Sequence, residues 1–157
     1  MTATKQEKSH PQGTSVPVFY RDIPFWLAVA CGPVSWLLLW FSDTPRAAIH
    51  VPVTALLIAS LIYPVLEEFV FRGGLQPALL ARPVFRKRVG PVSLANVLTS
   101  IAFAAAHLLR QPPLWAALVL LPSLVFGWSR ERYDSIVPPT LLHMFYNAGF
   151  IWLFVEA

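Results

Sequence analysis

The sequence contains few charged residues. Asp, Glu, Lys and Arg make up 13% of its 157 residues, whereas soluble domains carry about 25%. Hydrophobic residues make up 56%, and this balance excludes an ordinary soluble domain and indicates an integral membrane protein. The one cysteine, Cys31, cannot form an internal disulfide and lies in an apolar run, so we assign it to packing.

Other absences exclude further classes. The formal net charge is +4, yet the basic residues form no stripe interleaved with exposed aromatic residues, so we expect no nucleic acid as a partner. The chain shows no internal repeat, which makes it poorly suited to the alternating-access transport that paired repeats support. Its basic residues lie between apolar segments, where they set the orientation of a membrane protein.

The apolar segments predict an all-α fold, a polytopic transmembrane helical bundle of about five spans. We expect these spans at residues 24–41, 47–81, 91–109, 114–128 and 136–157. Residues 1–23 are polar and predict a disordered cytoplasmic tail, which leaves residues 24–157 as one membrane domain. The basic loops at 82–90 and 129–135 then lie in the cytoplasm with the N-terminus, as the positive-inside rule requires.

The second span is longer than a membrane needs. A helix over residues 47–81, at a rise of 1.5 Å per residue, exceeds the hydrocarbon core of about 30 Å, so a break or a strong tilt is required. Pro64 is the predicted break, because proline removes a backbone hydrogen bond and can begin a new helical segment. Glu67 then falls in the first turn of that segment, where the helix dipole favours negative charge.

Three charged side chains lie inside this span, within the stretch YPVLEEFVFRGGL. An ionised group at the centre of a bilayer costs about 2.5–3.5 kcal/mol and usually marks a functional site. Glu68 and Arg72 stand at i and i+4 and are predicted to form an ion pair. Glu67 points about 100° away and is left as the free carboxylate, a proton acceptor in apolar surroundings. The structural alternative is a buried ion pair with one glutamate that reaches the membrane surface.

Two later spans carry histidines. The segment FAAAH places Phe103 and His107 on one helix face, and HMFYN places His143 and Asn147 on one face, each pair at i and i+4. A lone buried histidine is more often a hydrogen-bonded core residue. Three separate helices that each bring acid–base or hydrogen-bonding groups into apolar surroundings indicate that the groups converge on one site.

The depths of these side chains do not agree in a bundle of straight helices. Counting from the basic loops at 1.5 Å per residue places Glu67 roughly 20 Å, His107 about 25 Å and His143 about 10 Å deep. Tilted or broken helices are therefore required to bring the three side chains together.

The three motifs resemble those of a known family. EEFVFR is similar to the EExxxR motif, FAAAH to the FxxxH motif and HMFYN to the HxxxN motif of the CAAX-type intramembrane proteases, also called the CPBP or prenyl-protease-like family. They occur in the family's order, and the likeness covers residues 64–149. The resemblance implies a membrane-embedded endopeptidase in the bacterial inner (cytoplasmic) membrane, with a membrane-associated protein or peptide as its substrate.

The resemblance also implies roles for the site residues. Glu67 would activate the attacking water with help from His107, while His143 and Asn147 would position the water and stabilise the oxyanion. Glu68 and Arg72 would support the cavity. Because no HExxH helix is present, we favour a metal-free, glutamate-based hydrolase without a cofactor. Zinc held by Glu67, His107 and His143 is the alternative.

Larger relatives use further segments for prenyl recognition, so the small size of this chain weakens the case for a prenylated CAAX protein as its substrate. The small bacterial, myxosortase-like relatives imply a C-terminal sorting signal instead, which is our expected substrate. Two alternatives have no proteolytic step. The protein would then be a non-catalytic membrane immunity or assembly factor, or a proton-coupled transporter with Glu67 as its relay.

Overall fold

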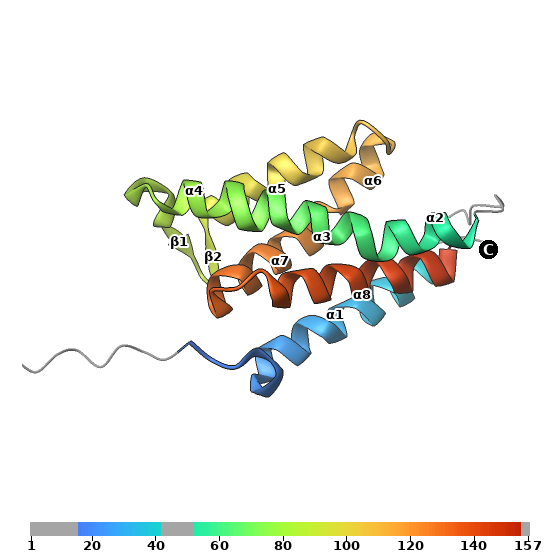
Figure 1. The fold of residues 1–157 in the computed structure, drawn as a ribbon, viewed down its shortest axis with the longest axis horizontal. Helices are drawn as coiled ribbons and strands as arrows, with labels where there is room; N and C mark the ends of the chain where they lie inside the picture. Colours follow the sequence, from blue (N-terminus) through green and yellow to red (C-terminus); the bar gives the residue numbers. More distant parts are fainter. Residues whose placement is uncertain (1–15, 42–51, 155–157) are drawn as a thin grey trace, which may run out of the picture.

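The computed structural model describes residues 16–41 and 52–154, and this part of the chain folds into five helical rods and one small hairpin (Figure 1). The first rod is α1 (Ile23–Trp40), preceded by the 3₁₀ turn η1 (Phe19–Arg21). The second rod runs without interruption through α2 (Val53–Leu57), η2 (Ile58–Ile62), α3 (Tyr63–Glu68), η3 (Phe69–Leu75) and α4 (Gln76–Leu80). Of the predicted tail at residues 1–23, residues 1–15 lie outside the described residues, and residues 19–21 form η1. The predicted start of the second span, 47–51, also lies outside the described residues.

The remaining elements complete the bundle. A 3₁₀ turn, η4 (Pro83–Arg86), leads to the antiparallel strands β1 (Arg88–Val89) and β2 (Val92–Ser93). The last three rods are α5 (Leu94–His107), α6 (Pro113–Leu118) with α7 (Leu120–Tyr133), and α8 (Val137–Phe154). In the view of Figure 1, α8 lies in the middle of the bundle, and it contacts α1, α7 and the second rod.

Three rods are long and apolar enough to cross a membrane, judged by length and composition: Ile23–Trp40, Val53–Leu80 and Pro113–Tyr133. The prediction of a helical integral membrane protein is confirmed in this coarse form, whereas five spans and a cytoplasmic N-terminus stay predictions. The predicted third span is wrong at its start, because residues 91–93 belong to the hairpin, whose Gly90 has a φ of 58°. Its helix, α5, has 14 residues, which is about 21 Å and shorter than the hydrocarbon core.

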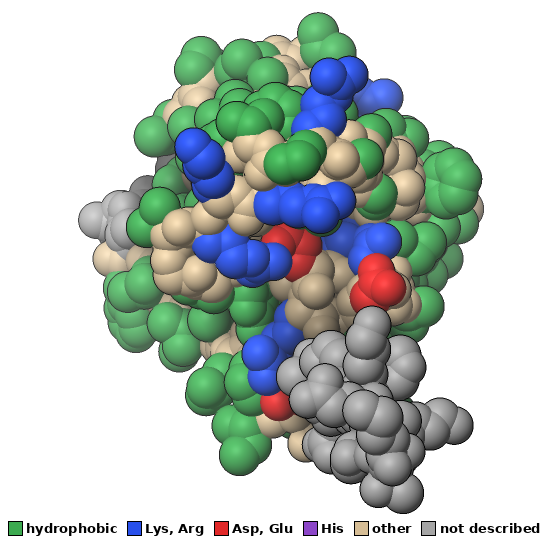
Figure 2. All heavy atoms as spheres, turned by 90° about the vertical axis from the view of Figure 1, so that its left-hand side faces the viewer, with side chains coloured by type: hydrophobic (Ala, Val, Ile, Leu, Met, Phe, Trp, Pro, Cys, Tyr) green, Lys and Arg blue, Asp and Glu red, His purple; other side chains and the backbone are tan. Residues whose placement is uncertain are grey.

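The predicted loop at residues 129–135 is mostly helix. α7 continues to Tyr133 and ends at Asp134, which takes the left-handed conformation with a φ of 45°. Arg130 pairs with Asp134 at 2.8 Å, and Arg132 Nε donates to Asp22 Oδ2 at 2.6 Å. The hydrogen bond from Arg132 holds the pKa of Asp22 below its ordinary value. The bond between Arg132 and Asp22 ties the end of α7 to the residue that precedes α1, while Arg130 and Asp134 pair within the end of α7. Figure 2 shows basic groups gathered at one end of the molecule.

Two helix crossings depend on glycine. A Cβ on Gly127 of α7 would lie 1.9 Å from Oδ1 of Asn96 in α5, and a Cβ on Gly149 of α8 would lie 2.1 Å from the ring of Trp36 in α1. A side chain at either position would force the helices apart, so the two glycines set the close approach of these rods.

Pro64 does not break the second rod, and the prediction of a new helix start at this residue is wrong. The preceding segment, η2, is a π-helical turn in which an N–H donates to the carbonyl five residues earlier, as Tyr63 does to Ile58. Pro64 has no N–H, so the carbonyl of Ala59 loses its partner in this register. Asn147 Nδ2 of α8 donates to that carbonyl at 3.2 Å. Glu67 therefore lies inside a continuous rod and not at a free helix start.

The same arrangement recurs thirteen residues later at the second π-helical segment, η3. In its register the carbonyl of Arg72 would bond to position 77, which is Pro77 and has no N–H. Arg130 Nε of α7 donates to the carbonyl of Arg72 instead, at 3.1 Å. Each π turn thereby leaves a main-chain acceptor that another helix uses.

Tyr146 of α8 bonds to a main-chain carbonyl of α1. Its hydroxyl donates to the carbonyl of Ala28, and its ring lies against Gly32, where a Cβ would approach it to 3.1 Å. Because α1 is an α-helix, Pro33 frees the carbonyl four residues earlier, that of Val29, so the bond to Ala28 does not replace one lost to a proline. Two contacts between helices, at Ala59 and Arg72, therefore depend on carbonyls that precede a proline by five residues.

We expect Asn147→Ala to lower the free energy of unfolding by about 1–3 kcal/mol, because it leaves the carbonyl of Ala59 unpaired. In a Pro64→Ala background, the new N–H at position 64 can bond to this carbonyl, so the same substitution costs much less. Unfolding of the purified protein in detergent, measured for all four members of this double-mutant cycle, gives the two costs. Equal costs in both backgrounds would contradict the π register.

Candidate active site

A buried carboxylate, Glu68, lies at the centre of the polar contacts. Its side chain has no exposed surface, and its Oε1 accepts hydrogen bonds from Arg72 Nη1 at 3.0 Å and from His143 Nδ1 at 2.9 Å. The ion pair predicted from the i, i+4 spacing of Glu68 and Arg72 is thus confirmed. Oε2 of Glu68 has no hydrogen-bond partner among the described residues. A buried, incompletely paired carboxylate is expensive, which favours a functional reason for its presence.

Arg72 is as deeply buried as its partner. Its Nη2 donates to the side-chain and main-chain oxygens of Ser123 in α7, at 2.6 and 2.9 Å. The guanidinium group lies 4.6 Å from the ring centroid of Phe103 and 5.6 Å from that of Phe126. Aromatic faces and α7 oxygens therefore replace water around this cation. The main-chain carbonyl of Arg72 also accepts a hydrogen bond from Arg130 of α7. Arg72 therefore joins the second rod to α7 through both its side chain and its main chain.

His143 connects the two glutamates. Its ring is stacked on Phe126, with centroids 4.8 Å apart, and its Nδ1–H donates to Glu68. In the neutral imidazole, the lone pair of Nε2 then faces Oε2 of Glu67, 3.6 Å away. Two acceptors do not bond directly, so this contact requires a proton on one of the groups or a water that bonds to both.

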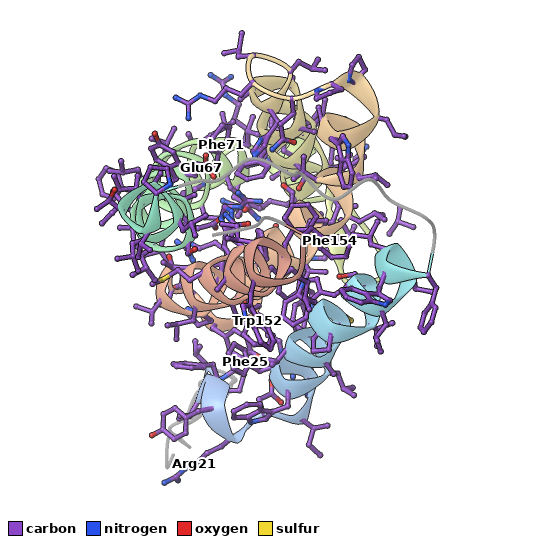
Figure 3. The ribbon with its side chains drawn as sticks, turned by 90° about the vertical axis from the view of Figure 1, so that its right-hand side faces the viewer. Arg21, Phe25, Glu67, Phe71, Trp152 and Phe154 are labelled. Carbon is purple, nitrogen blue, oxygen red and sulfur yellow. The ribbon has the colours of Figure 1, made fainter. Side chains whose placement is uncertain are left out.

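Glu67 differs from Glu68 in its access to the surroundings. Its side chain keeps 31% of its surface exposed, against 0% for Glu68, and among the described residues no Lys or Arg pairs with it. Figure 3 shows Glu67 on the second rod beside Phe71. The geometry agrees with the division inferred from the sequence, in which Glu68 is neutralised by Arg72 and Glu67 is free. The catalytic role of Glu67 stays a prediction.

His107 reaches the site through Phe103. Its Nδ1 bonds to the carbonyl of Phe103 at 2.9 Å, which leaves Nε2 as the acceptor of the neutral ring. The Phe103 ring contacts both histidines, with centroids 4.6 Å from His107 and 5.6 Å from His143. Within the described residues, no hydrogen bond joins His107 to Glu67 or to His143. His107 thus borders the site without direct contact.

Asn147 also lies at the border of the site. It follows His143 by one turn of α8, and its amide donates to Ala59, two turns before the glutamates on the second rod. In the described part of the chain, no hydrogen bond joins it to Glu67 or His143. Direct contacts therefore join Glu67, Glu68, Arg72 and His143, while His107 and Asn147 flank them.

The residues proposed for zinc do not form a ligand cluster. Residues 16–41 and 52–154 contain no group of three His, Cys, Asp or Glu side chains that could hold a metal ion. His143 uses Nδ1 on Glu68, and Glu68 is already paired with Arg72. Glu67, His107 and His143 are accordingly not assembled as the three protein ligands that catalytic zinc usually has.

Some residues of the site were not found from the sequence. Ser123 and Phe126 of α7 enclose Arg72 and His143, but neither belongs to a motif with charged or histidine partners. Outside the site, Glu131 lies in the segment predicted to be a basic loop, although an acid between two arginines could have been a signal. Its carboxylate, 4% exposed, accepts from Gln76 Nε2 at 2.8 Å and also contacts Ser93 and Arg88.

Taken together, the contacts define a membrane-embedded helical bundle with a carboxylate–histidine site between its helices. Residues 49–149 match the family model described as type II CAAX prenyl endopeptidase Rce1-like. The match covers more than half of the chain, and the protein belongs to this family, which confirms the resemblance inferred from the three motifs. Comparison with curated proteins and with solved structures gave no significant match. Membership of this family implies a membrane protease.

We expect Arg72→Leu to lower the free energy of unfolding by about 3–5 kcal/mol, because it leaves the carboxylate of Glu68 buried without a counter-charge. The double variant Glu68→Gln/Arg72→Leu should recover part of this loss, since it removes the second charge as well. Unfolding of both variants and the wild type in the same detergent measures the effect. A double variant less stable than Arg72→Leu alone would show that the charge of Glu68 is not the cause.

Proposed function

We propose that this protein is an intramembrane endopeptidase that hydrolyses a peptide bond of a membrane-associated protein with a water activated by Glu67. One observation carries the proposal. Among the described residues, Glu67 is a partly exposed carboxylate that no Lys or Arg pairs with, next to the neutralised Glu68–Arg72 pair and 3.6 Å from Nε2 of His143. Membership of the prenyl endopeptidase family supports the same class of reaction.

In this proposal, Glu67 is the general base. It takes a proton from the water as the water oxygen bonds to the carbonyl carbon of the scissile peptide, which gives a tetrahedral oxyanion. The protonated Glu67 then donates its proton to the leaving nitrogen as the C–N bond breaks. This donation regenerates the carboxylate of Glu67. The products are a carboxylic acid, which then loses its proton to the surrounding water, and a free amine.

The flanking residues support this step. Nε2 of His107, an acceptor because Nδ1 is bonded to Phe103, can hold the water beside Glu67. We assign His143 and Asn147 to the oxyanion, since the Asn147 amide has a second N–H besides the one given to Ala59. One such donor in a dry site is worth about 2.7–4 kcal/mol. His143 can donate from Nε2 when it carries both protons.

The proposed substrate is a C-terminal sorting signal on a membrane-associated protein, and the proposed location is the bacterial inner membrane. The partly exposed side chain of Glu67 on an apolar rod supports access by a peptide that itself lies in or beside the membrane.

We expect Glu67→Gln to lower the rate of cleavage by about 100- to 10,000-fold, because glutamine keeps the shape of the side chain but cannot accept the proton. Tyr63→Phe is the matched control, since Tyr63 is exposed one turn earlier on the same helix and should tolerate the change. Mass spectrometry of protein termini compares cells that contain equal amounts of wild type and of each variant. Identical termini in the wild-type and Glu67→Gln cells would remove the support for proteolysis.

A tight zinc chelator should leave the activity of the purified protein unchanged. The reason is that Nδ1 of His143 is bonded to Glu68, which is itself paired with Arg72, and that the candidate zinc ligands are not grouped in the described residues. The assay follows cleavage of a peptide nominated by the terminus comparison, with and without the chelator. Loss of activity that added zinc restores would favour the zinc-dependent alternative.

A further inference from the structure

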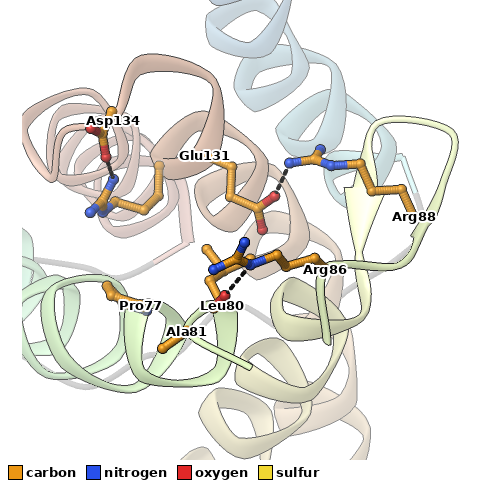
Figure 4. Close-up of a pocket in the computed structure, with 8 residues that line it drawn as sticks. Pro77, Leu80, Ala81, Arg86, Arg88, Glu131 and Asp134 are labelled. Atoms are coloured by element: carbon orange, nitrogen blue, oxygen red, sulfur yellow. Dashed lines mark hydrogen bonds and ion pairs between the residues drawn. The ribbon is translucent and has the colours of Figure 1, made fainter. Parts of the chain in front are cut away.

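A cavity at the end of the second rod has no part in the proposed chemistry. It measures about 390 Å³ and opens between the end of α4, the turn η4, strand β1 and the end of α7 (Figure 4). Cavities of roughly 300–1,000 Å³ hold small ligands. Figure 2 shows that Lys and Arg side chains gather on this end of the molecule.

The cavity lining carries an excess of positive charge. Its three arginines, Arg86, Arg88 and Arg130, outnumber its two acids, Glu131 and Asp134. Glu131 is already satisfied inside the protein, because Gln76, Ser93 and Arg88 all bond to its carboxylate (Figure 4 shows the bond from Arg88). The cavity therefore favours an anion.

Two of these arginines keep donors for a ligand. Arg86 uses Nε on the carbonyl of Leu80, at 2.6 Å, and within the described residues its two terminal amino groups make no hydrogen bond. Arg130 uses Nε on the carbonyl of Arg72 and Nη1 on Asp134, which leaves Nη2. The bonds to Nε fix the orientation of both side chains. Guanidinium groups held in this way match the geometry of phosphate oxygens.

The other wall of the cavity is apolar and belongs to the membrane part of the protein. Pro77 and Leu80 line it, and both lie in the candidate span Val53–Leu80. Val84 and Val89, in the segment that follows, are 50% and 88% exposed. The cavity thus lies where a span ends, which is the level of lipid headgroups, with cations on one side and apolar surface on the other.

We propose that this cavity binds the phosphate group of an anionic membrane phospholipid. The phosphate oxygens bond to Arg86 and Arg130, and the glycerol and the start of the acyl chains lie along Pro77 and Leu80. A free phosphate ion would leave the apolar wall unused, and a peptide carboxylate offers fewer acceptor oxygens to the arginines. The proposal rests on the cavity and its place at the end of a span, and it does not depend on proteolysis.

The test measures retained lipid on the full chain. Wild type, Arg86→Gln and Arg82→Gln are purified in neutral detergent and mixed with equal amounts of phosphatidylglycerol and phosphatidylcholine, and native mass spectrometry counts the lipid that stays bound. Arg82→Gln is the matched control, because it removes the same charge from the same loop outside the cavity. Thermal unfolding in detergent checks that all three proteins are folded.

We expect wild type to retain phosphatidylglycerol in preference to phosphatidylcholine. Loss of a charge-assisted hydrogen bond in Arg86→Gln should lower this retention about tenfold. At an ionic strength of about 0.15 M, where exposed charges are largely screened, Arg82→Gln should stay within about twofold of wild type. A photoactivatable phosphatidylglycerol should label wild type at residues 77–90 and 130–134, which keeps the test valid if Arg86→Gln fails to fold.

Several results would overturn the proposal. An equal loss in Arg86→Gln and Arg82→Gln would indicate a diffuse attraction to the basic end of the molecule. Equal retention of the two lipids would show that anionic lipid is not selected. Displacement of the lipid by millimolar inorganic phosphate would identify a soluble ion as the ligand, and displacement by a peptide with a free C-terminal carboxylate would identify a peptide.

Discussion

The ion pair of Glu68 and Arg72 is the constraint on which the rest of the site depends. Both side chains are completely buried in an otherwise apolar rod, where an unpaired charge costs several kcal/mol. The helices around the pair therefore have to supply polar partners. α7 does so through Ser123, and α8 does so through His143. The arrangement that neutralises Glu68 also places His143 beside Glu67, so the stability of the pair and the chemistry of the site share the same contacts.

The charged contacts within the second rod could be predicted from the sequence, because they follow from spacing along a helix. The i, i+4 rule predicted the pair of Glu68 and Arg72 and left Glu67 free, as the structure shows. The helical, membrane-embedded class followed from composition. Spacing along one helix could not predict the contacts between different helices. Ser123 and Phe126 lie close to Arg72, and Glu131 lies close to Gln76, although about fifty positions separate the partners in the sequence. A single sequence does not record such closeness in space.

The errors have physical reasons of their own. The segment 129–135 was interpreted as a loop because it is basic and polar, but its side chains satisfy one another and Asp22, so the helix continues to Tyr133. Counting depth along straight helices separated Glu67 from His143 by about 10 Å, whereas their side chains are 3.6 Å apart. The count began at a loop that is mostly helix, and it treated the second span as a regular α-helix although part of it is π-helical.

The bonds to Ala28, Ala59 and Arg72 affect how the protein can change over evolution. In each of them the acceptor is a peptide carbonyl, so the side chain at that position is free to vary without loss of the bond. For all three bonds the requirement falls on the donor, and for Ala59 and Arg72 it also falls on the proline five residues further along. Methods that search for pairs of co-varying side chains would overlook these three helix contacts. In related sequences, the bonds to Ala59 and Arg72 would be recorded by a proline retained together with an Asn or Arg on another helix, while the residue that carries the carbonyl varies.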